Sequence, residues 1–185
     1  MQQSLSKLEK LLSQYAAYHL DRKNVITHFI GIPMIVFSII CLTARAEFTV
    51  VNYSVTLALI ILLFSTLYYL SLDLIFGLAM AVLFAVAYPV ALHIADYPML
   101  TWLILSIGFF VVGWIFQFVG HFYEKKKPAF VDDLVGLAIG PLFVLAEVVF
   151  LMGMRKPLEE KMLIEARKLR SEMDSTQHQS SSFSH

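Results

Sequence analysis

The fold is decided by the stretch LIFGLAMAVLFAVAYPVALHIA, which runs from Leu74 to Ala95 and contains no Asp, Glu, Lys or Arg. About 20 consecutive apolar residues are enough for a helix to cross the hydrocarbon core of a bilayer. The same composition extends on both sides, because the region from Val25 to Gly120 has only four charged side chains: Arg45, Glu47, Asp73 and Asp96. So few charges cannot keep the surface of a soluble domain hydrated. The sequence therefore predicts an integral membrane protein.

The overall composition agrees with that prediction. Hydrophobic residues make up 58% and charged residues 15% of the 185 residues, whereas a soluble domain carries roughly 25% charged residues. The 14 basic and 14 acidic side chains balance, so no net positive field attracts a nucleic acid. The single Cys41 lies in an apolar run, which excludes a disulfide framework and a cysteine-based metal site. An ordinary soluble enzyme, a disordered chain and a nucleic-acid binder are excluded.

Five stretches are long and apolar enough to be membrane helices: Val25–Ala44, Phe48–Leu72, Leu74–Ala95, Tyr97–Gly120 and Leu134–Met154. The fifth is the weakest, because Glu147 would place a charge at mid-depth at a cost of roughly 2.5–3.5 kcal/mol. We expect an all-α integral membrane bundle with four full spans plus a re-entrant or fifth hydrophobic helix. Short connections around Asp73 and Asp96 predict antiparallel neighbours.

Both ends of the chain carry amphipathic patterns. Apolar residues recur at spacings of three and four residues near the N-terminus and again after Pro157, which indicates a helix with one apolar face in each place. The two stripes are Leu5, Leu8, Leu12, Tyr15 and His19, and Leu158, Met162, Ala166, Leu169 and Met173. Asn24 is the expected N-cap of the first span. Residues 1–170 form the predicted membrane-embedded domain, and residues 171–185 a disordered polar tail.

The basic residues predict the orientation, because cytoplasmic loops carry the excess of Lys and Arg. If Leu134–Met154 crosses the membrane, seven basic residues lie on each side. If it does not cross, four spans place thirteen basic residues inside and only Arg45 outside. We therefore expect both termini to face the cytoplasm and the fifth stretch not to cross fully.

This orientation brings three histidines that are distant in sequence to the cytoplasmic side. His19 and His28 lie at the start of the first span and His121 at the end of the fourth, whereas His93 falls on the opposite side. On one continuous helix His19 and His28 would face opposite ways, so we expect a break at Asp21–Asn24 to bring their rings together. Neutral imidazole is the commonest metal ligand in proteins. The three are a candidate metal site; the competing interpretation is packed or solvated interfacial histidines.

Polar residues lie at helical spacing from these histidines. Gln117, His121 and Glu124 would share one helix face, and Tyr15 lies one turn before His19. The face offers an amide, an imidazole and a carboxylate, which makes its members candidate catalytic or orienting groups.

Several polar residues also have plainer structural interpretations. Glu124 would form an ion pair with Lys125–Lys127, or with Arg22 and Lys23. His93 would cap a helix end, and Asp73 would be a turn residue. Glu147 would pair with a site residue or line a cavity.

Two motifs resemble those of a known family. One is Tyr18-His19 followed by Asn24, His28, Gly31 and Pro33; the other is Gly113-Trp114-Ile115-Phe116-Gln117-Phe118-Val119-Gly120-His121, continued by Glu124, Pro128-Ala129 and Asp132. Together they are similar to a family of small multi-span proteins of bacterial membranes and the endoplasmic reticulum, over about residues 10–155. The family was long a domain of unknown function and includes a yeast Fe(II)-dependent dioxygenase that shortens 2-hydroxy fatty acids.

The resemblance implies an Fe(II) enzyme that performs α-oxidation of a long-chain 2-hydroxy fatty acid with dioxygen, giving the one-carbon-shorter acid and carbon dioxide. It implies His19, His28 and His121 as metal ligands, and with the helical spacing it makes Glu124, Gln117, Tyr15 and Asn24 the candidate catalytic and orienting residues. It also implies a bacterial inner membrane or the endoplasmic reticulum as the location, with the active site facing the cytoplasm and membrane lipid around the spans.

Two other classes of protein compete with this interpretation. In a non-enzymatic small membrane transporter or lipid-binding scaffold, the histidines would be interfacial structure. A transporter is expected to place polar groups at the bilayer midplane, whereas the polar groups here gather at one rim. A membrane di-iron hydroxylase or desaturase needs a larger histidine set than the six present, of which His178 and His185 lie in the tail.

Overall fold

A computed structural model describes residues 4–125 and 135–182. Within them the secondary structure is helical apart from one β-hairpin, which confirms the expected all-α class. The order is α1 (Lys7–Ala17), α2 (Arg22–Ala44), β1 (Glu47–Val50), β2 (Tyr53–Thr56), α3 (Leu57–Leu72), α4 (Leu74–Ala95), α5 (Met99–Glu124), α6 (Val135–Leu151) and α7 (Lys156–Ser182). The chain divides into two compact units, Met1–Val25 with His121–His185, and Ile26–Gly120. The boundaries between the units fall within α2 and α5.

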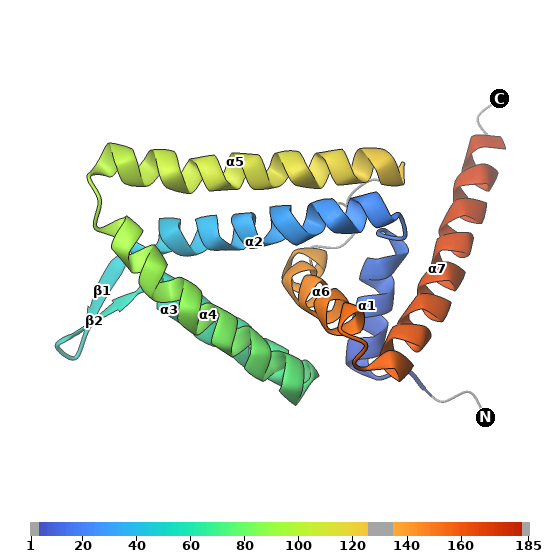
Figure 1. The fold of residues 1–185 in the computed structure, drawn as a ribbon, viewed down its shortest axis with the longest axis horizontal. Helices are drawn as coiled ribbons and strands as arrows, with labels where there is room; N and C mark the ends of the chain where they lie inside the picture. Colours follow the sequence, from blue (N-terminus) through green and yellow to red (C-terminus); the bar gives the residue numbers. More distant parts are fainter. Residues whose placement is uncertain (1–3, 126–134, 183–185) are drawn as a thin grey trace. The chain divides into compact units, whose positions relative to one another are not determined.

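Helices α2 and α5 lie antiparallel and side by side in the unit Ile26–Gly120 (Figure 1). Their backbones approach closely at two glycines, since a Cβ added to Gly31 would lie 2.7 Å from the carbonyl oxygen of Gly113. Farther along, the Ser38 hydroxyl donates a hydrogen bond of 2.7 Å to the carbonyl of Ser106. Small residues that allow backbones to meet and hydroxyls that bond across helices are typical of packing in lipid, where apolar association gains nothing over lipid contact.

Helices α3 and α4 form a tight antiparallel pair in the same unit. Asp73 caps α4, because its side chain accepts hydrogen bonds of 3.0 Å from the backbone N–H groups of Ile75 and Phe76. Gly77, one turn into α4, lies so close to Leu70 that an added Cβ would be 2.6 Å from its Cα. The interpretation of Asp73 as a turn residue is confirmed, and the bounds of α4 coincide with the stretch expected from hydropathy.

The prediction of one span over Phe48–Leu72 is wrong in its first part. Residues 47–56 form the antiparallel hairpin of β1 and β2, with Glu47 opposite Thr56 and Val50 opposite Tyr53, and the helix covers only α3. The turn has positive φ at Val51 and Asn52, as a two-residue hairpin turn requires. β-Branched and aromatic residues favour a strand over a helix here, and Thr56 then caps α3 by accepting from the backbone N–H of Leu59.

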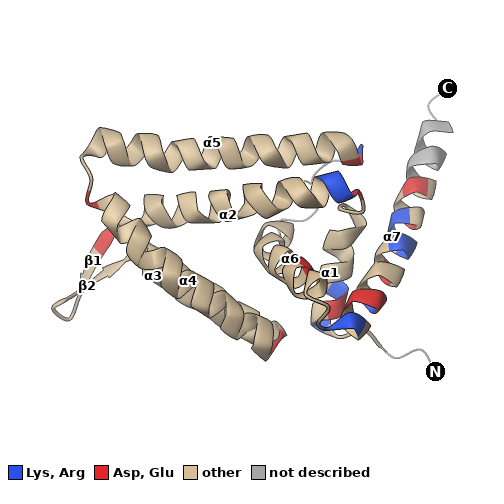
Figure 2. Ribbon diagram, viewed as in Figure 1, with Lys and Arg blue, Asp and Glu red and all other residues tan. Residues whose placement is uncertain are grey.

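The other unit is built from α1, α6 and α7 together with the adjoining ends of α2 and α5. Ser6 and Glu9 form a capping box at the start of α1. Both predicted amphipathic stripes point inward, because Leu8 and Leu12 of α1 and Met162 and Ala166 of α7 are buried. Charged residues lie at the start of α1 and along α7, whereas α3, α4 and α5 carry almost none along their lengths (Figure 2).

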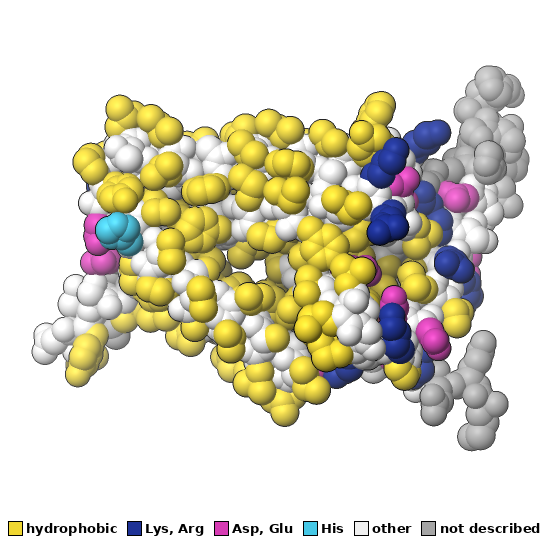
Figure 3. All heavy atoms as spheres, in the orientation of Figure 1, with side chains coloured by type: hydrophobic (Ala, Val, Ile, Leu, Met, Phe, Trp, Pro, Cys, Tyr) yellow, Lys and Arg dark blue, Asp and Glu magenta, His cyan; other side chains and the backbone are white. Residues whose placement is uncertain are grey.

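Three helices in the described part of the chain are long and apolar enough to cross a membrane: α2, α4 and α5. Helices α3 and α6 are apolar but shorter. Large apolar side chains remain exposed along α4 and α5, among them Val82, Val86, Ile104 and Ile115, and such side chains dominate the face seen in Figure 3. An apolar surface of this extent is suited to contact with lipid. The predicted count of four spans plus a fifth segment stays a prediction.

Candidate metal centre

His19 lies in the short link between α1 and α2 and is buried, at 3% exposure. Its Nδ1 donates a hydrogen bond of 2.6 Å to the carbonyl oxygen of Tyr15. The two rings stack with centroids 4.1 Å apart and planes 6° from parallel. Because Nδ1 holds its proton against a carbonyl, the lone pair of the neutral ring is on Nε2. A carbonyl bonded to the distal nitrogen is the usual way in which proteins orient a metal-binding histidine.

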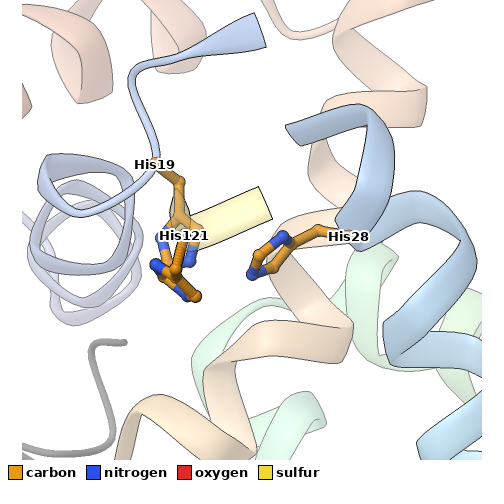
Figure 4. A group of neighbouring side chains, drawn as sticks. All are labelled: His19, His28 and His121. Atoms are coloured by element: carbon orange, nitrogen blue, oxygen red, sulfur yellow. The ribbon is translucent and has the colours of Figure 1, made fainter. Parts of the chain in front are cut away.

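Two further buried histidines meet this ring. His28 lies on the second turn of α2 and His121 on the last turn of α5, at 1% and 7% exposure. One ligand nitrogen from each of His19, His28 and His121 lies within 4.8 Å of the others, and Figure 4 shows the three rings turned toward one another. The rings of His19 and His121 meet edge to face, with centroids 5.0 Å apart. The structure therefore brings together the three histidines that sequence reasoning selected.

The break that lets His19 and His28 meet lies earlier than expected. Helix α1 ends at Ala17 and α2 begins at Arg22, so the link begins three residues before the predicted break at Asp21–Asn24 and shares only Asp21 with it. The N-cap prediction for Asn24 is also wrong. Asp21 occupies that position, because its carboxylate accepts a hydrogen bond of 2.7 Å from the N–H of Lys23. Asn24 lies inside the first turn of α2, completely buried.

The carboxylate of Glu124 is buried and engaged at both oxygens. Oε1 accepts a hydrogen bond of 2.8 Å from Nη1 of Arg170 on α7, which also makes the two residues an ion pair. Oε2 accepts from the backbone N–H of Asp21 at 2.8 Å and from Nδ2 of Asn24 at 3.1 Å. Sequence reasoning missed Arg170, since it is one of several basic residues on an amphipathic helix and has no distinguishing neighbour in the sequence.

The remaining candidates lie one turn from a histidine. Gln117 is buried at 6% exposure one turn before His121, and its Nε2 has no hydrogen-bond acceptor among the described residues. Tyr15 is buried beneath the ring of His19. Burial raises the pKa of the Tyr15 phenol above its usual range, so this side chain stays neutral at any physiological pH.

Two other residues discussed from the sequence lie outside the three-histidine group. His93 is exposed in the last turn of α4 and contacts Tyr97, 3.4 Å from Nε2 to the hydroxyl. That position matches its interpretation as a helix cap. Glu147 is partly buried on α6. Neither residue is among the ligand atoms that the structure groups together.

The donor set fits a metal ion. Imidazole nitrogens coordinate at about 2.0–2.2 Å, so two donors on opposite sides of an ion lie at most about 4.4 Å apart. The nitrogens here, within 4.8 Å of one another, reach that arrangement by small ring movements. Imidazole suits iron, zinc, copper and nickel, so the set is compatible with iron without selecting it.

Fold and site together define a class: a small helical protein with helices suited to a membrane and a buried three-histidine centre able to hold a metal ion. Comparison of the chain with known proteins identifies the family within this class. Residues 5–152 match the family described as 2-hydroxy-palmitic acid dioxygenase Mpo1-like. The 2-hydroxy-palmitic acid dioxygenase MPO1 of Saccharomyces cerevisiae (strain ATCC 204508 / S288c) is 33% identical over 177 residues, which cover 92% of this chain and 98% of the yeast protein.

The chain therefore belongs to the Mpo1-like family, and the resemblance noted in its histidine motifs is confirmed. No solved structure matches the chain.

Proposed function

We propose that this protein is an Fe(II)-dependent dioxygenase that converts a long-chain 2-hydroxy fatty acid into the acid one carbon shorter and carbon dioxide. The observation that carries the proposal is the group of three buried histidines on a chain related to a protein named for this substrate and reaction type. The family relation favours an enzyme over the transporter or scaffold that the sequence alone left open.

His19, His28 and His121 hold the iron in this proposal. When bound, Fe(II) supplies open coordination positions for the hydroxyl and carboxylate of the substrate and for dioxygen. The task of the chain is to present three neutral rings in fixed orientations. Tyr15 does this for His19 through its carbonyl and the stacked ring. Gln117, Asn24 and Glu124 are the other proposed orienting residues, each within one turn of a histidine on its own helix.

Basic side chains next to the histidines attract the substrate carboxylate in this proposal. Arg22 and Lys23 begin α2, and Lys125 follows α5; all three are exposed. Lys23 also lies over the ring of Tyr123, at 4.9 Å from its centroid. The acyl chain would lie against apolar helix surface, where each buried CH₂ contributes about 0.8 kcal/mol.

Metal analysis tests the proposal directly. We expect the purified protein to contain about one iron ion per chain, and a chelator to remove both the iron and the consumption of dioxygen in the presence of a 2-hydroxy fatty acid. Added Fe(II) should restore consumption, whereas added Zn(II) should not, since zinc has no redox chemistry. Equal turnover with and without the chelator would rule out the metal mechanism.

The proposed location is an integral membrane position, in a bacterial inner membrane or the endoplasmic reticulum, with the histidine centre on the cytoplasmic side. Single cysteines at Ser175 and Ser54 test the orientation in intact cells or vesicles. The charge count predicts that Ser175→Cys on α7 is labelled only from the cytoplasmic side and Ser54→Cys in β2 only from the other side. The native Cys41 is fully buried and gives little background. Labelling of Ser175→Cys exclusively from outside would refute the orientation.

A further inference from the structure

Arg170 of α7 joins three backbone or side-chain acceptors near the histidine centre. Its Nη1 donates to the carbonyl of Ala17 at 2.8 Å and to Oε1 of Glu124 at 2.8 Å. Its Nη2 donates to the carbonyl of Glu124 at 3.4 Å. A planar guanidinium presents five donors in a fixed fork, whereas a lysine presents three rotatable donors from a single nitrogen. Arg170 lies beyond residues 5–152, the part of the chain that matches the family.

The two carbonyls that Arg170 contacts belong to the last residues of two helices. Ala17 ends α1 and Glu124 ends α5. Carbonyls at helix C-termini lack partners within the helix and carry the negative end of the helix dipole, so a cation is favoured at each. The side chain of Arg170 is 17% exposed and that of Glu124 only 2% exposed. Water is therefore a poor replacement for the guanidinium at this position.

Glu124 passes the constraint on to the start of α2. Its Oε2 accepts from the backbone N–H of Asp21, the N-cap residue of α2, and from Nδ2 of Asn24. Asn24 in turn donates to the carbonyl of Tyr18 at 3.3 Å. Three donors, one of them a guanidinium, therefore occupy both oxygens of the Glu124 carboxylate.

These contacts fix the segment that carries His19 at both of its ends. Arg170 bonds the carbonyl of Ala17, two residues before His19, and Glu124 bonds the N–H of Asp21, two residues after it. The same carboxylate lies one turn after His121 on α5. The ring of His19 is thereby set against the ring of His121, 5.0 Å away between centroids.

We infer that Arg170 and Glu124 are positioning residues of the metal centre, and that α7 is part of the functional site although it supplies no histidine to it. The inference rests on the proposed function and gives Glu124 the role of orienting the histidines, not of binding the metal ion. If α7 only packed against the rest of the protein, loss of its contacts would not change the positions of the histidine rings.

Helix α7 provides a matched control for the test. Lys161 of α7 forms an ion pair of 3.0 Å with Glu9 of α1, so it also joins α7 to α1. Lys161 is 45% exposed, and its partner Glu9 lies in the first turn of α1, at the opposite end from Ala17. Lys161→Gln removes an ion pair between the same two helices and leaves the contacts of Ala17, Asp21 and Glu124 in place.

The first measurement is metal affinity in full-length protein, by Co(II) titration followed through its visible absorption. We expect Arg170→Gln to raise the dissociation constant about 10–100-fold, the range found for the loss of an outer partner of a metal ligand, and to change the Co(II) spectrum at saturation. Arg170→Lys keeps the charge and should recover part of the affinity. Lys161→Gln should stay within about twofold of the wild type. An Arg170→Gln protein with wild-type affinity and spectrum would overturn the inference.

The second measurement needs no metal and separates this inference from the proposed function. Hydrogen exchange of the metal-free protein should be faster across residues 18–28 in Arg170→Gln, at least about tenfold at Asp21, and unchanged there in Lys161→Gln. Unchanged exchange in a folded Arg170→Gln, or in Arg170→Lys if the former does not fold, would overturn the positioning role. If the wild type binds no metal but exchange responds in this way, the proposed function fails and the positioning of the His19 segment stands.

Discussion

His121→Ala should extract from the membrane as a folded protein that neither consumes dioxygen nor shortens a 2-hydroxy fatty acid. The variant loses one of three imidazole donors in the candidate centre. Loss of an outer partner alone costs about 10–100-fold, so we expect loss of a ligand to reduce turnover by more than about 100-fold. The fold should survive, because α5 is held by the close approach at Gly113 and the bond at Ser106, which do not involve this ring.

His93→Ala is the matched control, since it removes the same side chain from another helix. His93 is exposed, contacts only Tyr97 among the interactions described for its ring, and lies outside the histidine group. Its loss should leave turnover within about twofold of the wild type. Measurements of dioxygen uptake, product acid and iron content on both variants test whether turnover depends on His121 and not on His93. A folded but inactive His93→Ala would show that a fourth histidine belongs to the site and that the assumed span directions are wrong.

Sequence reasoning predicted those parts of the fold in which a single local feature of the sequence determines the secondary structure. The bounds of α4 follow from charge alone, because Asp73 and Asp96 flank an uncharged stretch and Asp73 is also its N-cap. The apolar stripes of α1 and α7 follow from helical spacing, and Leu8, Leu12 and Met162 are buried as the stripes require.

The hairpin was missed because hydropathy does not distinguish an apolar strand from an apolar helix. The run from Phe48 is apolar enough to join the following helix in a single stretch. Its β-branched residues and the turn at Val51 and Asn52 were the signal that could have separated the two elements. The N-cap of α2 was misplaced for a related reason: Asp21 and Asn24 are both good caps, and the choice between them depends on where α1 ends.

The grouping of the three histidines was predictable from the sequence, but the contacts that support it were not. Helix polarity and charge counting were sufficient to place His19, His28 and His121 at one end of the spans. The partner of Glu124 was not predictable, because Arg170 follows it by 46 residues and resembles the other basic residues of α7. Only packing of α7 against α1 selects this arginine from among them.

Removal of the 2-hydroxyl from the substrate should abolish the reaction, and the reason is electron balance. In the proposed reaction R–CH(OH)–COOH and O₂ give R–COOH, CO₂ and H₂O. The bond between C1 and C2 breaks, C2 gives up three electrons and C1 one, and dioxygen takes up all four. A fatty acid without the hydroxyl would have to give up six electrons in reaching the same products, which one dioxygen molecule cannot accept. The hydroxyl is also the second donor through which the substrate would chelate iron.

The wild-type protein in vesicles should therefore consume one dioxygen for each carbon dioxide released from 2-hydroxypalmitic acid, with no added reductant or second oxidisable substrate. Palmitic acid of the same chain length should release none, although its acyl chain buries as many CH₂ groups and gains the same roughly 0.8 kcal/mol from each. Added palmitic acid should then inhibit by competing for the apolar surface. Dioxygen uptake and carbon dioxide release from carboxyl-labelled substrate measure both points. A ratio of dioxygen consumed to carbon dioxide released near two, or turnover that requires an added reductant, would contradict the proposed reaction. Neither outcome would contradict the three-histidine centre, because the stoichiometry tests the reaction whereas the metal content tests the site.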